Sequence, residues 1–283
     1  MGGTDALVLE DVPEATWRAF HEGRSHSRAV APERHVERWS RSQRLGASWR
    51  GDPIDDALIR GEAFRLHAEH VDVVQSLGSV ALARAAGQVS AHDFVLLLAD
   101  ADGVVVRSDG GGEFRDEARR VRLIEGAAWS EAARGTNAIG TAASERRPTV
   151  VLGRAHFAAS YHQLACYAAP ILDLHGRVVG VLDATSRVDH ASDEVGAAVF
   201  GAAEVLTELL RLQAYATAGG SVLRVLARSL DRATSPALLI EAPGRVARMN
   251  APARIALGGV AAGGPVRALL GLDWAALVDE AMA

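Results

Sequence analysis

The side chains that could carry chemistry in this sequence are a single cysteine, ten histidines and a polar cluster that contains two glycines. Cys166 opens an apolar run, where a buried thiol acts as a small hydrophobic group. Lysine is absent from the whole sequence, which excludes Schiff-base and Walker-lysine chemistry. No Gly-x-Ser-x-Gly motif and no cluster of paired carboxylates stands out. The sequence therefore does not predict an enzyme.

A metal-binding set could be drawn from His156, His162, Cys166 and Asp173. The two histidines are six residues apart, which is not the i, i+4 pairing of ligands carried on one helix face. The single cysteine also excludes an intrachain disulfide and any Cys-Cys zinc site. We therefore expect no bound metal, iron included, and no other cofactor.

The polar cluster lies in the segment 129–140, where the glycines allow close approach of the backbone. Glu131, Thr136 and Asn137 can cap helices or bind the nearby backbone, and would then fix a loop between two helices. Alternatively, these side chains rim a ligand cavity. The residue types leave both interpretations open.

The composition is that of an ordinary globular chain. Apolar residues make up 49% and charged residues 23% of 283 residues, enough for two modest domains. No run approaches the ~18 apolar residues of a membrane span, and a signal-peptide pattern is lacking, so we expect a cytoplasmic protein. The net charge is −5 and the arginines are scattered among acidic residues. We therefore expect neither membrane association nor direct nucleic-acid binding by these residues.

The elements that would position these residues follow from periodicity and turn signals. Two hairpins are predicted, because apolar runs flank Asp100–Gly103 and Asp173–Gly176. The predicted strands are 94–99, 104–106, 149–152, 166–172 and 178–184. The predicted helices are 32–44, 55–86 with Gly87 as its stop, and 193–215. The fold class is therefore α+β, an antiparallel sheet covered by helices on one face.

Changes of pattern divide the chain. Residues 1–30 show no sustained period and are expected to be a partly ordered leader. Residues 31–90 form an N-terminal helical segment, and residues 91–216 form the sheet domain. After Gly219-Gly220, the segment 221–283 begins another domain, with a helix over 221–230, strands over 237–241 and 246–250, and a helix over 251–257. These residues are too few to complete that domain, so we expect the natural chain to continue.

The sheet domain resembles the GAF sensor domain of acetoin- and glycerol-catabolism activators, which are sigma-54-dependent transcriptional activators. The residues that carry the resemblance are Trp129-Ser130-Glu131, Gly135 to Ala142, His156-Phe157, Cys166 to Ile171, Asp173, Gly176 and Gly180 to Asp183. Upstream, Arg38 to Ser42 is similar to that family's Ser-Trp-x-Arg-Ser segment, with Arg38 in place of the first Ser. Weaker similarity relates Ala237–Leu257 to the opening of a PAS domain.

The resemblance implies a GAF-like fold that senses a signal and controls ATPase and DNA-binding domains absent from this chain. The effector would be a small organic molecule held between the sheet and its covering loops. Carried over from the family, the candidate pocket residues are Trp129, Asn137, His156, Phe157, Cys166 and Asp183, to which the polar cluster adds Glu131. Ala155 stands where the family usually has Glu, which suggests a different effector.

Two other functions stay open at this stage. The resemblance includes a nitric-oxide-responsive relative with a non-haem iron, and glycerol-type relatives that bind a regulatory protein partner. A docking and dimerisation module without a small ligand is therefore one alternative, and an iron gas sensor is another. A homodimer is expected in either case, because the helix 193–215 carries an apolar stripe wider than one sheet face requires.

Overall fold

The computed structural model describes residues 6–23, 31–50, 58–217, 234, 236–241, 244–258, 263–271, 273 and 275. The chain divides into two compact units, Met1–Arg211 and Leu212–Ala283. The predicted helix over 221–230 and the Gly219-Gly220 break lie outside the described residues.

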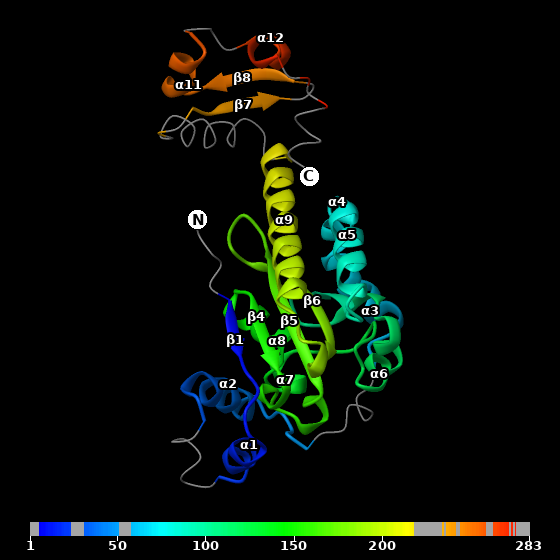
Figure 1. Ribbon diagram of the computed structural model, residues 1–283. Coiled ribbons are helices and arrows are strands. Elements are labelled where there is room, and N and C mark those ends of the chain that lie inside the picture. Colours follow the sequence, from blue (N-terminus) through cyan, green and yellow to red (C-terminus); the bar gives the residue numbers. More distant parts are fainter. Residues whose placement is uncertain are drawn as a thin grey trace. The chain divides into compact units, whose positions relative to one another are not determined.

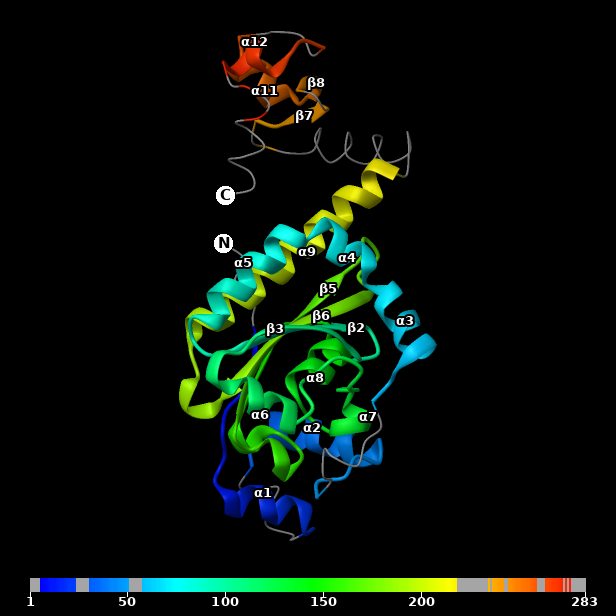
Figure 2. The ribbon, with the colours of Figure 1, turned by 90° about the vertical axis from the view of Figure 1, so that its right-hand side faces the viewer.

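The first unit is built on a six-stranded sheet with the order β1-β4-β5-β6-β2-β3 (Figures 1 and 2). Its strands are β1 (Leu7–Leu9), β2 (Val95–Asp100), β3 (Val105–Gly110), β4 (Thr149–Leu152), β5 (Leu164–Leu172) and β6 (Val178–Arg187). All neighbouring strands are antiparallel except β1 and β4, which are parallel. A multi-strand sheet flanked by helices confirms the α+β class.

The two predicted hairpins are β2–β3 and β5–β6, and their turns use the predicted chemistry. Asp100 Oδ1 accepts hydrogen bonds from the backbone N–H groups two and four residues further on, at 3.0 and 2.9 Å. Asp173 Oδ1 accepts the equivalent pair at 2.8 and 2.9 Å. Gly103 and Gly176 close the turns with φ of +79° and +76°, a conformation that favours glycine.

Helices cover both faces of the sheet, so the prediction of one covered face was wrong. α5 (Ser79–Ser90) and α9 (Asp193–Thr217) lie side by side on one face, and α8 (Ala138–Glu145) lies on the other (Figure 2). Along β2, Leu96 and Leu98 belong to the core under α5 and α9, whereas Leu97 and Ala99 belong to the core under α8. The unbroken apolar run at 94–99 reflects this burial on both faces.

From residue 58 on, the helix predicted over 55–86 is instead three helices, and residues 55–57 lie outside the described residues. They are α3 (Gly61–His70), α4 (Asp72–Leu77) and α5, which continues through Gly87 to Ser90. Gly78 lies between α4 and α5, and close packing requires a glycine there, because a Cβ atom would lie 2.8 Å from the backbone oxygen of Val74 and 1.9 Å from Leu206 Cδ2 of α9. Gly87 does not end α5, since burial of the neighbouring Ala85 and Val89 outweighs its low helix propensity.

Two elements of the segment taken as a leader belong to the fold. β1 pairs with β4, and α1 (Glu14–His21) packs with the predicted helix α2 (Glu33–Arg44) in an aromatic cluster. That cluster contains Val12, Trp17, Phe20, Ala31, Trp39 and Phe157. The sequence did not predict β1 or α1, because three-residue and eight-residue elements show too little periodicity.

Short elements complete the first unit. They are α6 (Arg115–Arg120), α7 (Glu131–Arg134) and the 3₁₀ turns Gly112–Phe114, Gly153–Ala155, Ala159–Tyr161 and Val188–His190. In the second unit, β7 (Leu238–Glu241) pairs antiparallel with β8 (Arg245–Met249), followed by α11 (Ala251–Ala256) and α12 (Val266–Leu270). Among the described residues, no helix is both long and apolar enough to cross a membrane.

Candidate functional site

A small interior space lies between the sheet and α8. It is lined by Leu123, Trp129, Asn137, Ala138, Ile139, Cys166, Asp183 and Thr185, each at most 3% exposed. The gap between these side chains has no room for a water molecule. We call this space the α8 cavity. It brings together four of the predicted site residues, Trp129, Asn137, Cys166 and Asp183.

Asp183 is the carboxylate of the α8 cavity. It lies on β6 and is 1% exposed. Its Oδ2 accepts a hydrogen bond from Thr185 Oγ1 at 2.8 Å, whereas its Oδ1 has no hydrogen-bond partner. Burial raises the pKa of Asp183 to about 7, although the Thr185 hydrogen bond opposes the rise. A buried polar atom without a partner is rare in folded proteins and marks a place where a ligand could bind.

Cys166 and His156 form a buried contact beside the cavity. His156 Nδ1 lies 2.9 Å from Gly153 O and donates to it, which leaves Nε2 to accept from the Cys166 thiol at 3.3 Å. Burial lowers the pKa of His156 to about 4. Burial, together with the nearby Asp183, raises the pKa of Cys166 well above its usual value. The pair is therefore a neutral thiol and a neutral imidazole, and it lacks the thiolate that nucleophilic catalysis requires.

Asn137 and Trp129 are cavity walls whose polar atoms are bound within the loop. Asn137 caps α8, because its Oδ1 accepts from Gly140 N at 2.9 Å. Its Nδ2 donates to Trp129 O and Gly135 O at 3.0 and 2.8 Å. Trp129 Nε1 donates to Arg122 O at 2.9 Å. These contacts hold the loop against the sheet and leave the indole ring facing the cavity.

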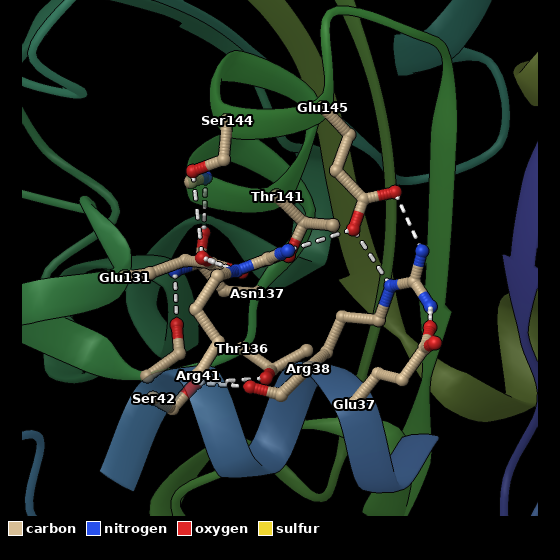
Figure 3. Close-up of polar contacts among 12 residues, drawn as sticks. Glu37, Arg38, Arg41, Ser42, Glu131, Thr136, Asn137, Thr141, Ser144 and Glu145 are labelled. Carbon is tan, nitrogen blue, oxygen red and sulfur yellow. Dashed lines mark hydrogen bonds and ion pairs between the residues drawn. The ribbon is translucent and has the colours of Figure 1, made fainter. Parts of the chain in front are cut away.

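Glu131 faces α2 and does not line the cavity (Figure 3). Its side chain is 2% exposed and accepts from Arg41 Nε and Nη2 at 2.5 and 2.7 Å. Thr141 Oγ1 donates to the same carboxylate at 2.8 Å. The Glu131 carboxylate therefore ties α7, α8 and α2 together.

A second carboxylate continues this contact (Figure 3). Glu145, at the end of α8, accepts from Arg38 Nε and Nη2 at 2.7 and 2.8 Å and from Arg41 Nη1 at 3.0 Å. Burial alone would raise the pKa of Glu145, but the hydrogen bonds from both arginines hold it at about 2. Ser42 Oγ lies 2.9 Å from Thr136 Oγ1. The segment Arg38–Ser42 thus holds α2 against α7 and α8. The sequence did not predict these contacts, because the partners are 90 or more residues away.

Phe157 and Asp173 lie away from the α8 cavity. Phe157 belongs to the aromatic cluster with Trp17 and Trp39, and its carbonyl accepts from Trp17 Nε1 at 3.1 Å. It packs against Gly135, where a Cβ atom would lie 2.3 Å from its ring. Asp173 fixes the β5–β6 turn. Within the described residues, His156, His162, Cys166 and Asp173 do not form a group able to hold a metal ion.

Comparison with known proteins places residues 29–203 in the family described as MimR, N-terminal domain. The acetoin catabolism regulatory protein of Cupriavidus necator is 31% identical over 76% of this chain and 33% of its own length. The acetoin dehydrogenase operon transcriptional activator AcoR of Bacillus subtilis is 30% identical over 59% of this chain and 28% of its own length. The chain thus spans about a third of the length of these relatives.

A solved structure shares the fold. A chain of the E. coli DhaR(N)–DhaL complex superimposes with a TM-score of 0.59, covering 88% of this chain and 85% of its own, at 19% identity.

Proposed function

We propose that this chain, which belongs to the MimR N-terminal domain family, is the signal-sensing region of a transcriptional activator and binds a small organic effector in the α8 cavity. Its relatives are regulators of which the matched region makes up only about a third. The remainder of the protein would supply the ATPase and DNA-binding domains of a sigma-54-dependent activator. The first unit would be the GAF-type sensor, and the second unit the beginning of a PAS-like domain.

The observation that carries the proposal is the unpartnered Oδ1 of Asp183. A buried acceptor without a donor costs about 1–3 kcal/mol, which an effector hydroxyl or amide N–H would recover. Leu123, Trp129 and Ile139 would surround the apolar remainder of the effector. Ligand sites commonly combine such apolar walls with a few polar groups that fix orientation. The chemistry fits a small, mostly apolar molecule with one donor.

Effector binding would have to widen the cavity, because it does not admit a water molecule. The sheet strands that carry Cys166, Asp183 and Thr185 are paired on both sides, whereas the wall opposite them consists of α8 and the loop at Trp129. We therefore assign the opening to a separation of α8 and this loop from the sheet. The sensor would exist in a closed and an open state, and the effector would favour the open one.

A protein-docking function is the second candidate. The structural neighbour was solved in a complex with another protein, DhaL. On this chain, apolar side chains remain exposed on α5 and α9, where Val80 is 71% and Leu212 62% exposed. Such side chains are suited to a protein partner or to a second copy of the chain.

Thermal unfolding of the 283-residue protein with small alcohols and ketones, starting with acetoin, tests the proposal. At a hundredfold excess over Kd, an effector adds about 2.7 kcal/mol, or roughly 5–10 °C in a domain of this size. In Asp183→Ala, the effector should no longer raise the melting temperature of the protein. Asp189→Asn, which alters an exposed carboxylate just beyond β6, should retain it.

Native mass spectrometry of the purified protein separates the two functions. A co-purified small molecule that is lost in Asp183→Ala supports the effector site. If the effector still raises the melting temperature of Asp183→Ala, the α8 cavity is not the binding site. A protein that carries no small molecule and responds to no compound supports the docking function instead.

A further inference from the structure

Away from the α8 cavity, three side chains converge where α3 meets the turn between β2 and β3. Asp100 Oδ2 lies 2.6 Å from His67 Nδ1 and 3.6 Å from His70 Nδ1. All three donor atoms lie within 4.8 Å of one another. In the part of the chain that the structure describes, this is the one such group of His, Cys, Asp or Glu. It shares no residue with the set considered from the sequence.

The carboxylate is fixed in place by the hairpin. Asp100 is fully buried at the end of β2, and its Oδ1 is occupied by the N–H groups of Asp102 and Val104. Only Oδ2 is left to face the two histidines. Hydrogen bonds that orient a ligating carboxylate in this way accompany most metal sites, because they fix the direction of the ligand atom.

The histidines are presented by helix geometry. His67 and His70 are three residues apart on α3, so their side chains share one face of the helix. Their side chains are 23% and 62% exposed. The group is therefore open to solvent on one side, and water could complete the coordination of an ion there.

One of these distances already suits a first-row transition metal. Zinc holds His and Asp ligands at about 2.0–2.2 Å, which places tetrahedral ligand atoms about 3.3–3.6 Å apart. The His70–Asp100 pair already has this spacing, at 3.6 Å. The His67–Asp100 pair, at 2.6 Å, would open by about 1 Å when a metal replaces the shared proton. Two imidazoles and one carboxylate are a donor set typical of zinc, iron, cobalt and nickel.

We propose that His67, His70 and Asp100 bind a divalent transition-metal ion, with zinc as the reference ion and water in the remaining positions. The proposal departs from our expectation of a metal-free chain, which rested on other histidines. The sequence offered a signal, a His-x-x-His pair ahead of an Asp-x-x-Gly turn, but the 29 residues between His70 and Asp100 conceal their contact.

A bound ion would link α3, which carries His67 and His70, to the end of β2, which carries Asp100. α3 has no buried residue of its own, so little apolar packing holds it. The turn that carries Asp100 also contacts the cavity wall, because Trp129 N donates to Gly103 O at 2.7 Å. Metal binding would therefore stabilise α3 directly and the Trp129 loop through the turn.

Titration calorimetry of the EDTA-treated, dialysed 283-residue protein with zinc chloride tests the site. We expect one equivalent to bind, and His67→Ala/His70→Ala to weaken the affinity by about 100-fold or more, since even outer-shell changes cost 10–100-fold. Asp100→Asn should also weaken it while keeping the Oδ1 acceptor that the turn requires. His92→Ala/His175→Ala is the matched control, because both of these histidines are exposed and outside the group.

Cobalt(II) absorption provides a second readout that does not depend on stability. We expect a d–d spectrum in the wild type and in the control, and its loss in His67→Ala/His70→Ala. Circular dichroism checks that each variant is folded. Failure of the wild type to bind zinc at micromolar concentration, or equal affinity in wild type and His67→Ala/His70→Ala, would overturn the proposal.

Discussion

Removing the guanidinium of Arg41 should destabilise the first unit far more than removing an exposed arginine. In Arg41→Ala the Glu131 carboxylate, 2% exposed, loses two hydrogen bonds and its cation. Breaking a buried ion pair from one side costs about 3–5 kcal/mol, because a buried charge is left without a partner. For a unit of this size the melting temperature should fall by roughly 6–20 °C.

The assay is urea unfolding at pH 7, followed by far-ultraviolet circular dichroism. Arg18→Ala is the matched control, since Arg18 and Glu14 form an exposed i, i+4 pair on α1. That pair should contribute only about 0.3–0.5 kcal/mol. In both variants an arginine paired with a glutamate is removed, so the difference isolates burial.

A double-mutant cycle tests the stated cause. Glu131→Gln neutralises the buried charge, so Arg41→Ala should cost less in a Glu131→Gln background, with a coupling of about 2 kcal/mol. Additive effects of the two substitutions would refute the reasoning. So would a loss below about 1 kcal/mol in Arg41→Ala, because Glu131 would then be solvated or paired in another way.

In urea titrations, Asp183→Asn should raise the free energy of unfolding by up to about 4 kcal/mol at pH 8 and change it little at pH 4. The reason is that the folded pKa of Asp183, about 7, exceeds the unfolded value near 3.8, so the wild type loses stability as the pH rises between them. Glu145 has the opposite effect on the pH dependence of stability, because its folded pKa of about 2 lies below its unfolded value of 4.5. Its contribution to stability is present above pH 4.5 and lost toward pH 2, so Glu145→Gln should reduce the loss of stability between these pH values. Light scattering should show a dimer that Val205→Glu/Leu212→Glu dissociates, because these side chains are 47% and 62% exposed on α9; a monomeric wild type would remove this prediction. The Cys166 thiol should react with Ellman's reagent only after unfolding, and fast reaction in the native protein would contradict the burial that raises its pKa.

Local chemistry explains which parts of the fold the sequence could predict. The hairpins at Asp100 and Asp173 were predictable, because an Asp side chain and a Gly at positive φ specify each turn within four residues. The pairing of β1 with β4 was not, since it joins residues some 140 positions apart. The need for glycine at position 78 was equally hidden, because the side chain packed against it, Leu206, belongs to a helix more than a hundred residues later.

The site shows the same division. Trp129, Asn137, Cys166 and Asp183 were named through resemblance, and all four line the α8 cavity. Their individual roles were not predictable: the hydrogen bonds of Asn137 are all local, whereas the unpartnered oxygen of Asp183 emerges only from three-dimensional packing. Glu131 was read as part of a rim, but its partner is Arg41, 90 residues earlier.

One strand connects the cavity to α9. Asp183 and Thr185 line the cavity, while the adjacent Leu182 and Ala184 belong to the core under α5 and α9. Side chains alternate along a strand, so any displacement of β6 by an effector moves both surfaces together. α9 begins on that core with Val195 and continues past Arg211, where the first unit ends.

The cavity wall opposite β6, formed by α8, determines how much of the displacement on effector binding is taken up by β6 and how much by α8. α8 is tied to α2 through Glu131, Glu145 and their two arginines, so its separation from the sheet must move α2 or break that network. If the network stays intact, effector binding displaces β6 more than α8, and β6 in turn displaces α9. Weakening it with Arg41→Ala should then let α8 yield alone, so that effector binding tightens while its effect on α9 diminishes. Hydrogen exchange of α9 amides with and without effector measures this: equal effector-induced changes in wild type and Arg41→Ala would exclude a role for the network in directing the signal.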